Sequence, residues 1–164
     1  MKKTWSIDIH KDYLKFSAAH FLIFPDGSAE RLHGHNYKVY VDVETELDPH
    51  GLVINFKEIK PLIREIVDEL DEYLLIPGRH PVLTCEARDD GLSEICYRER
   101  RYLIPTDEIR VLPITNSSAE NLANYVAETL LERFGRRFDG RRPAALTVAV
   151  EETPSQRGIV RVEP

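Results

Sequence analysis

Apolar and polar residues alternate along two stretches near the start of the chain, 13–22 and 33–46. In both stretches every second side chain falls on one apolar face, as the geometry of a β-strand requires. The first face carries Leu14, Phe16, Ala18, His20 and Leu22. The second face carries His33, His35, Tyr37, Val39, Val41 and Val43. The pattern predicts two strands that point histidines to the same side as their apolar residues.

Two later segments have apolar residues at the spacing of amphipathic helices. The first follows the turn sequence DPHG at 48–51 and is expected to end near Asp71. Its apolar positions are Phe56, Ile59, Ile63, Ile66, Val67 and Leu70. The second is predicted to start at SSAEN, where Ser117 and Glu120 have capping-box spacing, and to end at Gly135. Its apolar positions include Leu122, Val126 and Leu130.

Two short strands, 146–150 and 158–162, are expected to close the chain. The segment at about 77–115, between the helices, is an insertion with a weaker pattern. In it, DDG at 89–91 predicts a hairpin turn. A flap and an oligomer contact are both open as its role. The resulting order is strand, strand, helix, insertion, helix, strand, strand, which is an α+β arrangement.

Composition predicts one domain over 1–164, because a chain of 164 residues with 42% hydrophobic and 30% charged content can bury one sizeable core. The formal net charge of -6 disfavours a nucleic-acid partner, which a clustered positive field would attract. No apolar run resembles a signal peptide or a membrane span. Cys85 and Cys96 lack a paired motif and are interpreted as reduced thiols, which predicts a cytoplasmic protein.

The histidines on the two strand faces form a candidate metal site. His33 and His35 are two apart on one strand, which places them about 6–7 Å apart at the backbone. From there both side chains can reach one ion at about 2.0–2.1 Å, and His20 supplies a third imidazole. Three imidazoles with an open fourth position are typical of a catalytic zinc site. The alternative is that each histidine is a core residue hydrogen-bonded to a carbonyl group.

A carboxylate also lies at the end of an apolar row in LTVAVEETP. Leu146, Val148 and Val150 define one strand face, and Glu152 falls on the same face. One interpretation is that the strand ends at Glu151 and that Glu152 is solvated. The other is that Glu152 binds a ligand with adjacent N–H donors, such as an aminopyrimidine ring, through two parallel hydrogen bonds.

At these motifs the chain resembles the 6-pyruvoyl-tetrahydropterin synthase and 6-carboxytetrahydropterin synthase family. The matching motifs are FSAAH at 16–20, LHGHNYKVYV at 32–41, ELDPHGLVINFKEIK at 46–60, LDEYLL at 70–75, SSAENLANYV at 117–126 and VEET at 150–153. They cover nearly the whole chain in order, except the insertion and the extreme N-terminus. The resemblance implies the tunnelling fold, in which antiparallel strands carry two helices on one face. It also implies that subunits join into an oligomeric barrel, commonly a homohexamer.

The resemblance further implies roles for particular residues. The zinc ligands would be His20, His33 and His35. The anchor for the pterin ring would be Glu152, with Thr153 beside it. The pterin pocket would also be lined by Ser118, Ala119 and Glu120, for which simple helix capping is the alternative.

The sequence departs from the family pattern at the proton-transfer residues. The family places a catalytic cysteine shortly before HGH, and this chain has Glu30 in that region. The Asp–His pair that follows the first helix in the family reads Asp71 and Glu72 here, and these two are the candidate catalytic residues beside Glu30. Some family members with a glutamate in place of the cysteine cleave the side chain to 6-hydroxymethyl-dihydropterin, so Glu30 is the natural substitute base. The alternative is that Glu30 is a solvated loop residue beside Arg31.

Three functions remain open at this point. The first is a zinc-dependent lyase that acts on 7,8-dihydroneopterin triphosphate or a related pterin. The second is a noncatalytic pterin-binding homologue that retains the zinc site. The third is a structural metal domain whose histidines only stabilise the oligomer. In each case we expect a homo-oligomer with no nucleic-acid or membrane partner.

Overall fold

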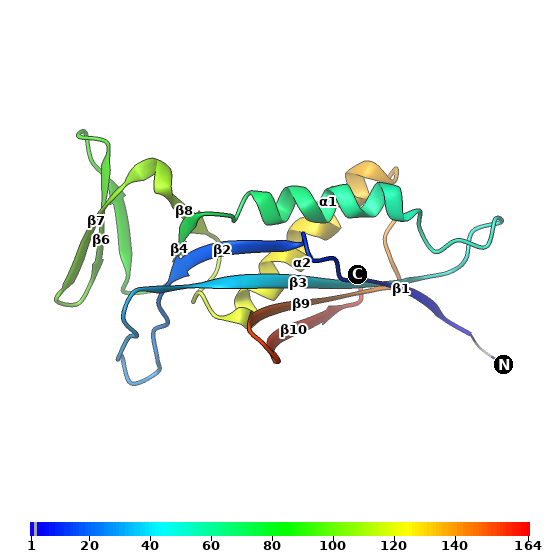
Figure 1. Cartoon of the computed structure of the whole chain (residues 1–164), viewed down its shortest axis with the longest axis horizontal. Coiled ribbons are helices and arrows are strands. Elements are labelled where there is room, and N and C mark those ends of the chain that lie inside the picture. Colours follow the sequence, from blue (N-terminus) through cyan, green and yellow to red (C-terminus); the bar gives the residue numbers. More distant parts are fainter. Residues whose placement is uncertain (2) are drawn as a thin grey trace.

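The computed structural model describes residue 1 and residues 3–164, and one long curved sheet runs through it (Figure 1). Within these residues, seven strands form the sheet in the order β10-β9-β3-β2-β4-β8, with β1 paired to β3. Their bounds are β1 Trp5–Ile9, β2 Lys15–His20, β3 His33–Thr45, β4 Tyr73–Pro77, β8 Ile109–Leu112, β9 Ala145–Thr153 and β10 Gln156–Val162. The predicted strand pairs β2–β3 and β9–β10 are both present and antiparallel.

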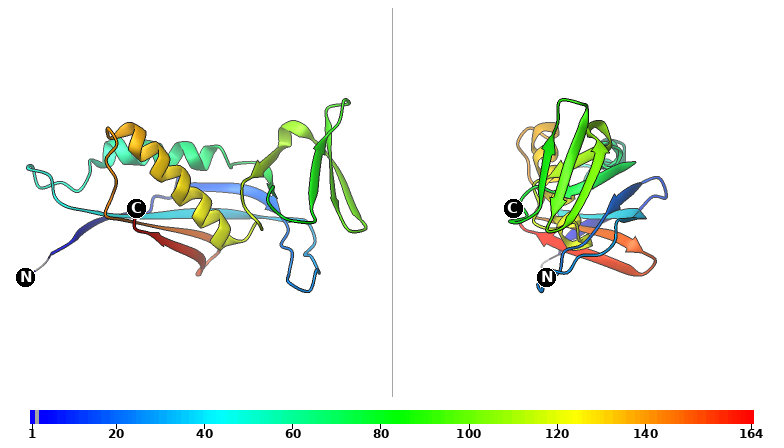
Figure 2. Two further views of the ribbon diagram at one scale, coloured as in Figure 1. Left: turned by 180° about the vertical axis from the view of Figure 1, so that it is seen from behind. Right: turned by 90° about the vertical axis from the view of Figure 1, so that its left-hand side faces the viewer.

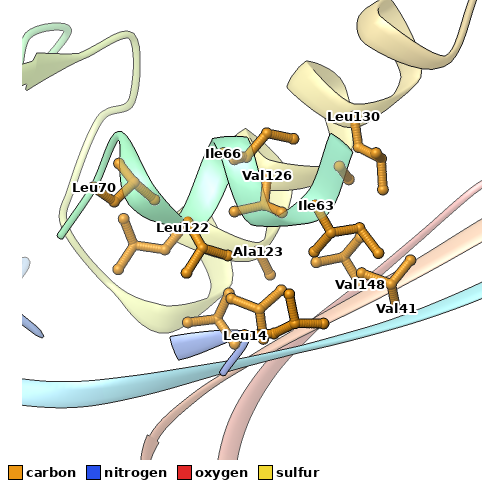
Figure 3. Close-up of a cluster of buried hydrophobic side chains, with 14 of the residues drawn as sticks. Leu14, Val41, Ile63, Ile66, Leu70, Leu122, Ala123, Val126, Leu130 and Val148 are labelled. Atoms are coloured by element: carbon orange, nitrogen blue, oxygen red, sulfur yellow. The ribbon is translucent and has the colours of Figure 1, made fainter. Parts of the chain in front are cut away.

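Two helices, α1 (Phe56–Asp68) and α2 (Ala119–Arg137), cover one face of this sheet (Figures 1 and 2). Their apolar stripes and the inner face of the strands enclose the main core, as the helical spacing predicted (Figure 3). The residues labelled there are Leu14, Val41, Ile63, Ile66, Leu70, Leu122, Ala123, Val126, Leu130 and Val148. In the described part of the chain no helix is both long and apolar enough to cross a membrane.

The start of α2 differs from the capping box predicted for Ser117 and Glu120. The helix is capped by Ser118, whose hydroxyl oxygen accepts the backbone N–H of Asn121 at 3.3 Å. Ser117 is fully buried and instead donates its hydroxyl to the Phe21 carbonyl at 3.0 Å. That prediction was wrong because contact with a distant segment, rather than local spacing, decides which serine turns toward the helix.

The segment between the helices contains regular strands that sequence periodicity did not resolve. β4 and β8 join the main sheet through parallel pairings, β4 with β2 and β8 with β4. A separate antiparallel sheet, here called the insert sheet, consists of β5 (Thr84–Ala87), β6 (Leu92–Tyr97) and β7 (Arg100–Pro105). It stands at one end of the long sheet (Figures 1 and 2). The predicted turn at DDG connects β5 to β6.

A second apolar cluster joins the insert sheet to the neighbouring end of the main sheet and to the loop at 21–32. Its buried members are Phe21, Ile23, Leu74, Ile76, Leu83, Ile95 and Tyr97. The insert sheet is therefore packed against the rest of the chain, and this buried apolar contact area stabilises the association of the two parts.

Gly158 of β10 brings the sheet into close contact with the first turn of α2. A Cβ added at Gly158 would lie 2.2 Å from the backbone nitrogen of Glu120 and 2.3 Å from the carbonyl carbon of Ala119. A Cβ added at Gly135, inside α2, would meet nothing within 4 Å. The same substitution, glycine to alanine, would therefore meet a crowded backbone at Gly158 and open space at Gly135.

We expect Gly158→Ala to lower the free energy of unfolding by about 1–3 kcal/mol, because α2 must move away from β10. Gly135→Ala is expected to raise it by about 0.5–1 kcal/mol, since alanine loses less backbone entropy in a helix. Urea denaturation at a fixed protein concentration measures both values. Equal stability of the two variants would contradict the close contact at Gly158.

Candidate metal centre and cavity

The pairing of β2 with β3 brings the three predicted metal ligands together. His20 is the direct cross-strand partner of His33, and His35 is opposite Ala18 on the same side. The ring centroids are 4.8 Å apart for His20 and His33, 5.3 Å for His20 and His35, and 4.8 Å for His33 and His35. One ligand nitrogen from each ring lies within 4.8 Å of the other two. This geometry allows the three rings to converge on one ion.

Backbone carbonyl groups orient two of the rings. Nδ1 of His20 lies 2.9 Å from the Ser117 carbonyl oxygen, and Nδ1 of His33 lies 2.7 Å from that of Arg31. A carbonyl oxygen can only accept, so each Nδ1 must carry the proton. The Nε2 lone pair of each ring is then left free, which is the arrangement that holds a metal-binding histidine in place.

His20 provides the test of whether these residues fit a metal ion. Its side chain is 0% exposed, and burial lowers the pKa of the ring, although the Ser117 carbonyl and the charge of Glu152 oppose that shift. Among the described residues, its buried Nε2 has no hydrogen-bond partner of acceptable geometry. An unpartnered buried polar atom costs about 1–3 kcal/mol. A metal ion would satisfy it, and imidazole donors suit zinc.

Glu152 completes this arrangement from a third strand. β9 extends beyond Glu151, so the interpretation that the strand ends there was wrong and Glu152 points along the predicted face. Its Oε1 lies 3.3 Å from Nε2 of His20 and 3.8 Å from Nε2 of His35. Carboxylate oxygens and imidazole lone pairs repel one another at such distances unless a cation or a proton lies between them. The contact therefore also favours a bound cation.

Tyr37 holds the Glu152 carboxylate from behind the histidines. Its hydroxyl donates a hydrogen bond to Oε1 of Glu152 at 3.4 Å. Burial raises the pKa of Tyr37, and the nearby charge of Glu152 raises it further, so the phenol stays neutral and remains a donor. Alternation had placed Tyr37 on the histidine face, but the sequence analysis did not single it out as a site residue. The carbonyl of Ser117, by contrast, had no sequence signal.

Glu30 approaches the histidine group at His33, whereas Glu152 approaches it at His20 and His35. Its Oε2 is 3.8 Å from Nε2 of His33 and accepts the backbone N–H of Leu22 at 3.1 Å. The side chain is 33% exposed. The loop at 21–32 thus brings a partly exposed carboxylate to the edge of the candidate metal centre.

Asp71 and Glu72 are placed differently from each other. Oδ1 of Asp71 accepts the backbone N–H of Ser17 at 2.7 Å, and the Glu72 N–H donates to the Ser17 carbonyl at 2.7 Å. Asp71 therefore fixes the start of β4 to β2. Glu72 has a left-handed backbone with φ of 64°, which is uncommon for a residue with a side chain, and it lines the adjoining cavity.

That cavity has a volume of about 930 Å³, which is within the usual range for small-molecule sites. Its lining includes His35, Glu72, Glu152 and Thr153. The predicted pocket residues Ser118, Ala119 and Glu120 are not part of that lining. Two of them, Ala119 and Glu120, instead face β10 at Gly158.

Comparison with known families gives one consistent result. The sequence model described as 6-pyruvoyl tetrahydropterin synthase matches residues 8–163. A relative from Methanocaldococcus jannaschii is 38% identical over 123 residues, which is 73% of each chain. The 6-carboxy-5,6,7,8-tetrahydropterin synthase of Bacillus subtilis is 28% identical over 159 residues, which is 96% of this chain and 86% of that protein.

Solved structures show the same likeness. The 6-pyruvoyl tetrahydropterin synthase of Plasmodium falciparum superposes with a TM-score of 0.91 at 27% identity, covering 99% of this chain and 100% of that one. Two structures of the Plasmodium vivax enzyme give the same TM-score and are variants in which a glutamate described as a catalytic residue is replaced by alanine or by cysteine. The match confirms the expected tunnelling fold and includes the insert sheet.

We expect His33→Ala to lose stoichiometric zinc, because two imidazoles bind the ion much more weakly than three. The control is His10→Ala, since the His10 side chain is 61% exposed and His10 directly follows β1, outside the histidine group. Metal content after identical purification, measured by inductively coupled plasma mass spectrometry, checks this. Wild-type zinc content in His33→Ala would rule out the site.

Proposed function

Because the chain belongs to the 6-pyruvoyl tetrahydropterin synthase family, we propose that it is a zinc-dependent lyase acting on 7,8-dihydroneopterin triphosphate or a closely related pterin. At the coarser level, it is a tetrahydropterin synthase-like lyase of pterin biosynthesis. The observation that carries the proposal is the convergence of three imidazoles and two carboxylates beside a cavity of ligand size.

The zinc ion would be held by His20, His33 and His35, whose ring nitrogens already converge. When bound, zinc would polarise the side-chain hydroxyl groups of the pterin and lower the cost of removing the neighbouring protons. Three protein ligands leave a coordination position for substrate, which distinguishes a catalytic site from a structural one.

Glu30 is proposed as the base that removes those protons. Its Oε2 is held by the Leu22 N–H, 3.8 Å from His33, while one third of the side chain remains exposed to incoming substrate. The catalytic glutamate of the Plasmodium vivax enzyme supports a carboxylate in this role. A glutamate base also fits cleavage of the pterin side chain to give 6-hydroxymethyl-dihydropterin, the outcome that we propose for this chain.

Glu152 is proposed as the anchor of the pterin ring. Its carboxylate lies at the cavity wall next to Thr153, and Tyr37 fixes one of its oxygens. Adjacent N–H groups of an aminopyrimidine ring match the two oxygens of a carboxylate, and such paired, charge-assisted hydrogen bonds are strong. The ring would then lie in the cavity with its side chain toward the histidines.

One observation favours the second candidate, a pterin-binding protein with little turnover. The carboxylate of Asp71 is engaged by the Ser17 backbone, and the family's neighbouring imidazole is replaced by Glu72. The usual proton relay is therefore absent from these two positions. Product formation separates the two candidates.

We expect zinc-loaded wild-type protein to convert 7,8-dihydroneopterin triphosphate, and Glu30→Gln to convert it about 10²–10⁴-fold more slowly, as is typical on loss of a general base. Zinc content should not change. Liquid chromatography with mass spectrometry identifies every pterin product. Glu86→Gln, an exposed substitution on β5, is the control.

Two results would contradict this proposal. Full turnover by Glu30→Gln would remove Glu30 as the base. No conversion by the wild type, together with tight pterin binding, would favour the noncatalytic homologue.

We expect Glu152→Gln to weaken pterin binding by about tenfold to hundredfold, because a neutral amide replaces charge-assisted hydrogen bonds. Its zinc content should equal that of the wild type. Fluorescence titration with neopterin gives the Kd, again with Glu86→Gln as the control. Loss of zinc from Glu152→Gln would show instead that this carboxylate is a fourth metal ligand, and unchanged affinity would remove it as the anchor.

A further inference from the structure

One arginine of the insert sheet contacts the backbone of both Ala29 and Glu30, and we propose that this residue, Arg100 of β7, positions Glu30 for catalysis. Its Nη1 donates a hydrogen bond to the carbonyl oxygen of Glu30 itself. Its Nη2 donates to the Ala29 carbonyl at 2.7 Å. The proposal rests on the function proposed above, in which Glu30 is the base.

The loop at 21–32 is a narrow hairpin whose two sides are held together beside the metal centre. An isolated bridge joins Ile23 to Ala29. The Glu30 N–H donates to the Leu22 carbonyl at 2.9 Å, and the Leu22 N–H donates back to the Glu30 carboxylate at 3.1 Å. The backbone of Glu30 therefore determines where its own carboxylate lies.

Arg100 is suited to this task by the shape of its side chain. A guanidinium group presents its N–H donors in a rigid planar fork, so one arginine can bind two successive carbonyl oxygens. Within the described part of the chain, Arg100 forms no ion pair with a carboxylate, whereas the next residue, Arg101, lies 3.8 Å from Glu94. The donors of Arg100 are thus used to hold backbone.

Neighbouring contacts hold the remainder of the hairpin. The Tyr97 hydroxyl donates to the Gly27 carbonyl at 2.8 Å. The side chain of Asn116 donates to the Ile23 carbonyl at 2.8 Å and accepts the Ile23 N–H at 3.2 Å. The hairpin tip and its first side are fixed by these residues, which leaves Arg100 as the contact from the insert sheet at the Glu30 end.

The consequence is that a residue outside the cavity controls the geometry of the proposed base. Without Arg100, the carbonyl groups of Ala29 and Glu30 lose their donors, and the backbone at this end of the hairpin is released. A displacement of about 1 Å between a catalytic group and its substrate can reduce turnover a hundredfold. The proposed zinc ligands lie on the paired strands β2 and β3, and among the contacts that orient them the Arg31 carbonyl at His33 lies in this loop. Because the ligands are held by strand pairing, zinc content should stay close to that of the wild type.

The test compares Arg100→Ala with Arg101→Ala in zinc-loaded, full-length protein. Arg101 is the matched control because it is the adjacent arginine and its side chain is 71% exposed. We expect Arg100→Ala to lower kcat with 7,8-dihydroneopterin triphosphate about tenfold to hundredfold, with KM and zinc content nearly unchanged. In the Glu30→Gln background, the same substitution should have no further effect on kcat.

Hydrogen–deuterium exchange supplies a readout that does not depend on turnover. Arg100→Ala should exchange faster than Arg101→Ala in peptides covering 21–32, with unchanged exchange in α2. Arg100→Lys, which can reach fewer carbonyl oxygens, should be intermediate in both kcat and exchange. If Arg100→Ala fails to fold, Arg100→Lys and Tyr97→Phe are compared with Arg101→Ala in its place.

Wild-type exchange at 21–32 together with wild-type kcat in Arg100→Ala would overturn the proposal. An equal loss of kcat from Arg100→Ala in the wild-type and Glu30→Gln backgrounds would also overturn it, because Arg100 would then act independently of Glu30. Full turnover by Glu30→Gln would instead remove Glu30 as the base, the part of the proposed function on which this inference rests. The exchange data would then decide by themselves whether Arg100 holds the loop.

Discussion

The register between β2 and β3 is the constraint on which the site depends. It sets His20 directly opposite His33 and places His35 two residues further along the same face. β3 is also the partner of β9, so the same strand brings Glu152 to the histidines. A shift of one residue would turn every side chain of a strand to the other face. The register is well specified because the same alternation continues into the apolar core under the helices, so the residues that stabilise the fold also align the ligands.

Local periodicity predicted the part of the site that is carried by strands. Side chains alternate between the two faces of a strand, and this alternation is a property of each strand alone. It placed the three histidines, Tyr37 and Glu152 on inner faces, and the structure retains that placement. The choice between Ser117 and Ser118 as the cap of α2 could not be made in the same way. It depends on whether a hydroxyl meets the Phe21 carbonyl, a contact between segments 96 residues apart, and no local pattern encodes such a contact.

The insert sheet shows the same limit more strongly. Its turn at DDG was predicted because turn chemistry is local, but its docking on the loop at 21–32 was not. Arg100 and Arg101 are identical in the sequence, and both follow a run of charged residues. Only the structure shows that one holds the backbone of Glu30, 70 residues away, while the other faces solvent. The parallel pairings of β4 and β8 were unexpected for a similar reason, since strand direction depends on the path of the intervening chain.

The core is apolar, whereas the candidate site beside it gathers several hydrogen-bond acceptors. This difference bears on how the loop at 21–32, which carries Glu30, is held in place. Beside the core, three imidazole lone pairs and the carboxylates of Glu30 and Glu152 point toward one small volume, an arrangement of acceptors that a cation would relieve. Repulsion would otherwise push the most mobile of these groups outward, and the loop-borne Glu30 is more easily displaced than groups on paired strands. A glutamate also has more rotatable bonds than the cysteine expected at this place in the family, so its carboxylate samples a wider range for the same backbone position. A carboxylate base in place of the thiol, as proposed for Glu30, would therefore need a more firmly fixed backbone, and the hydrogen bonds from Arg100 to the Ala29 and Glu30 carbonyls would supply it.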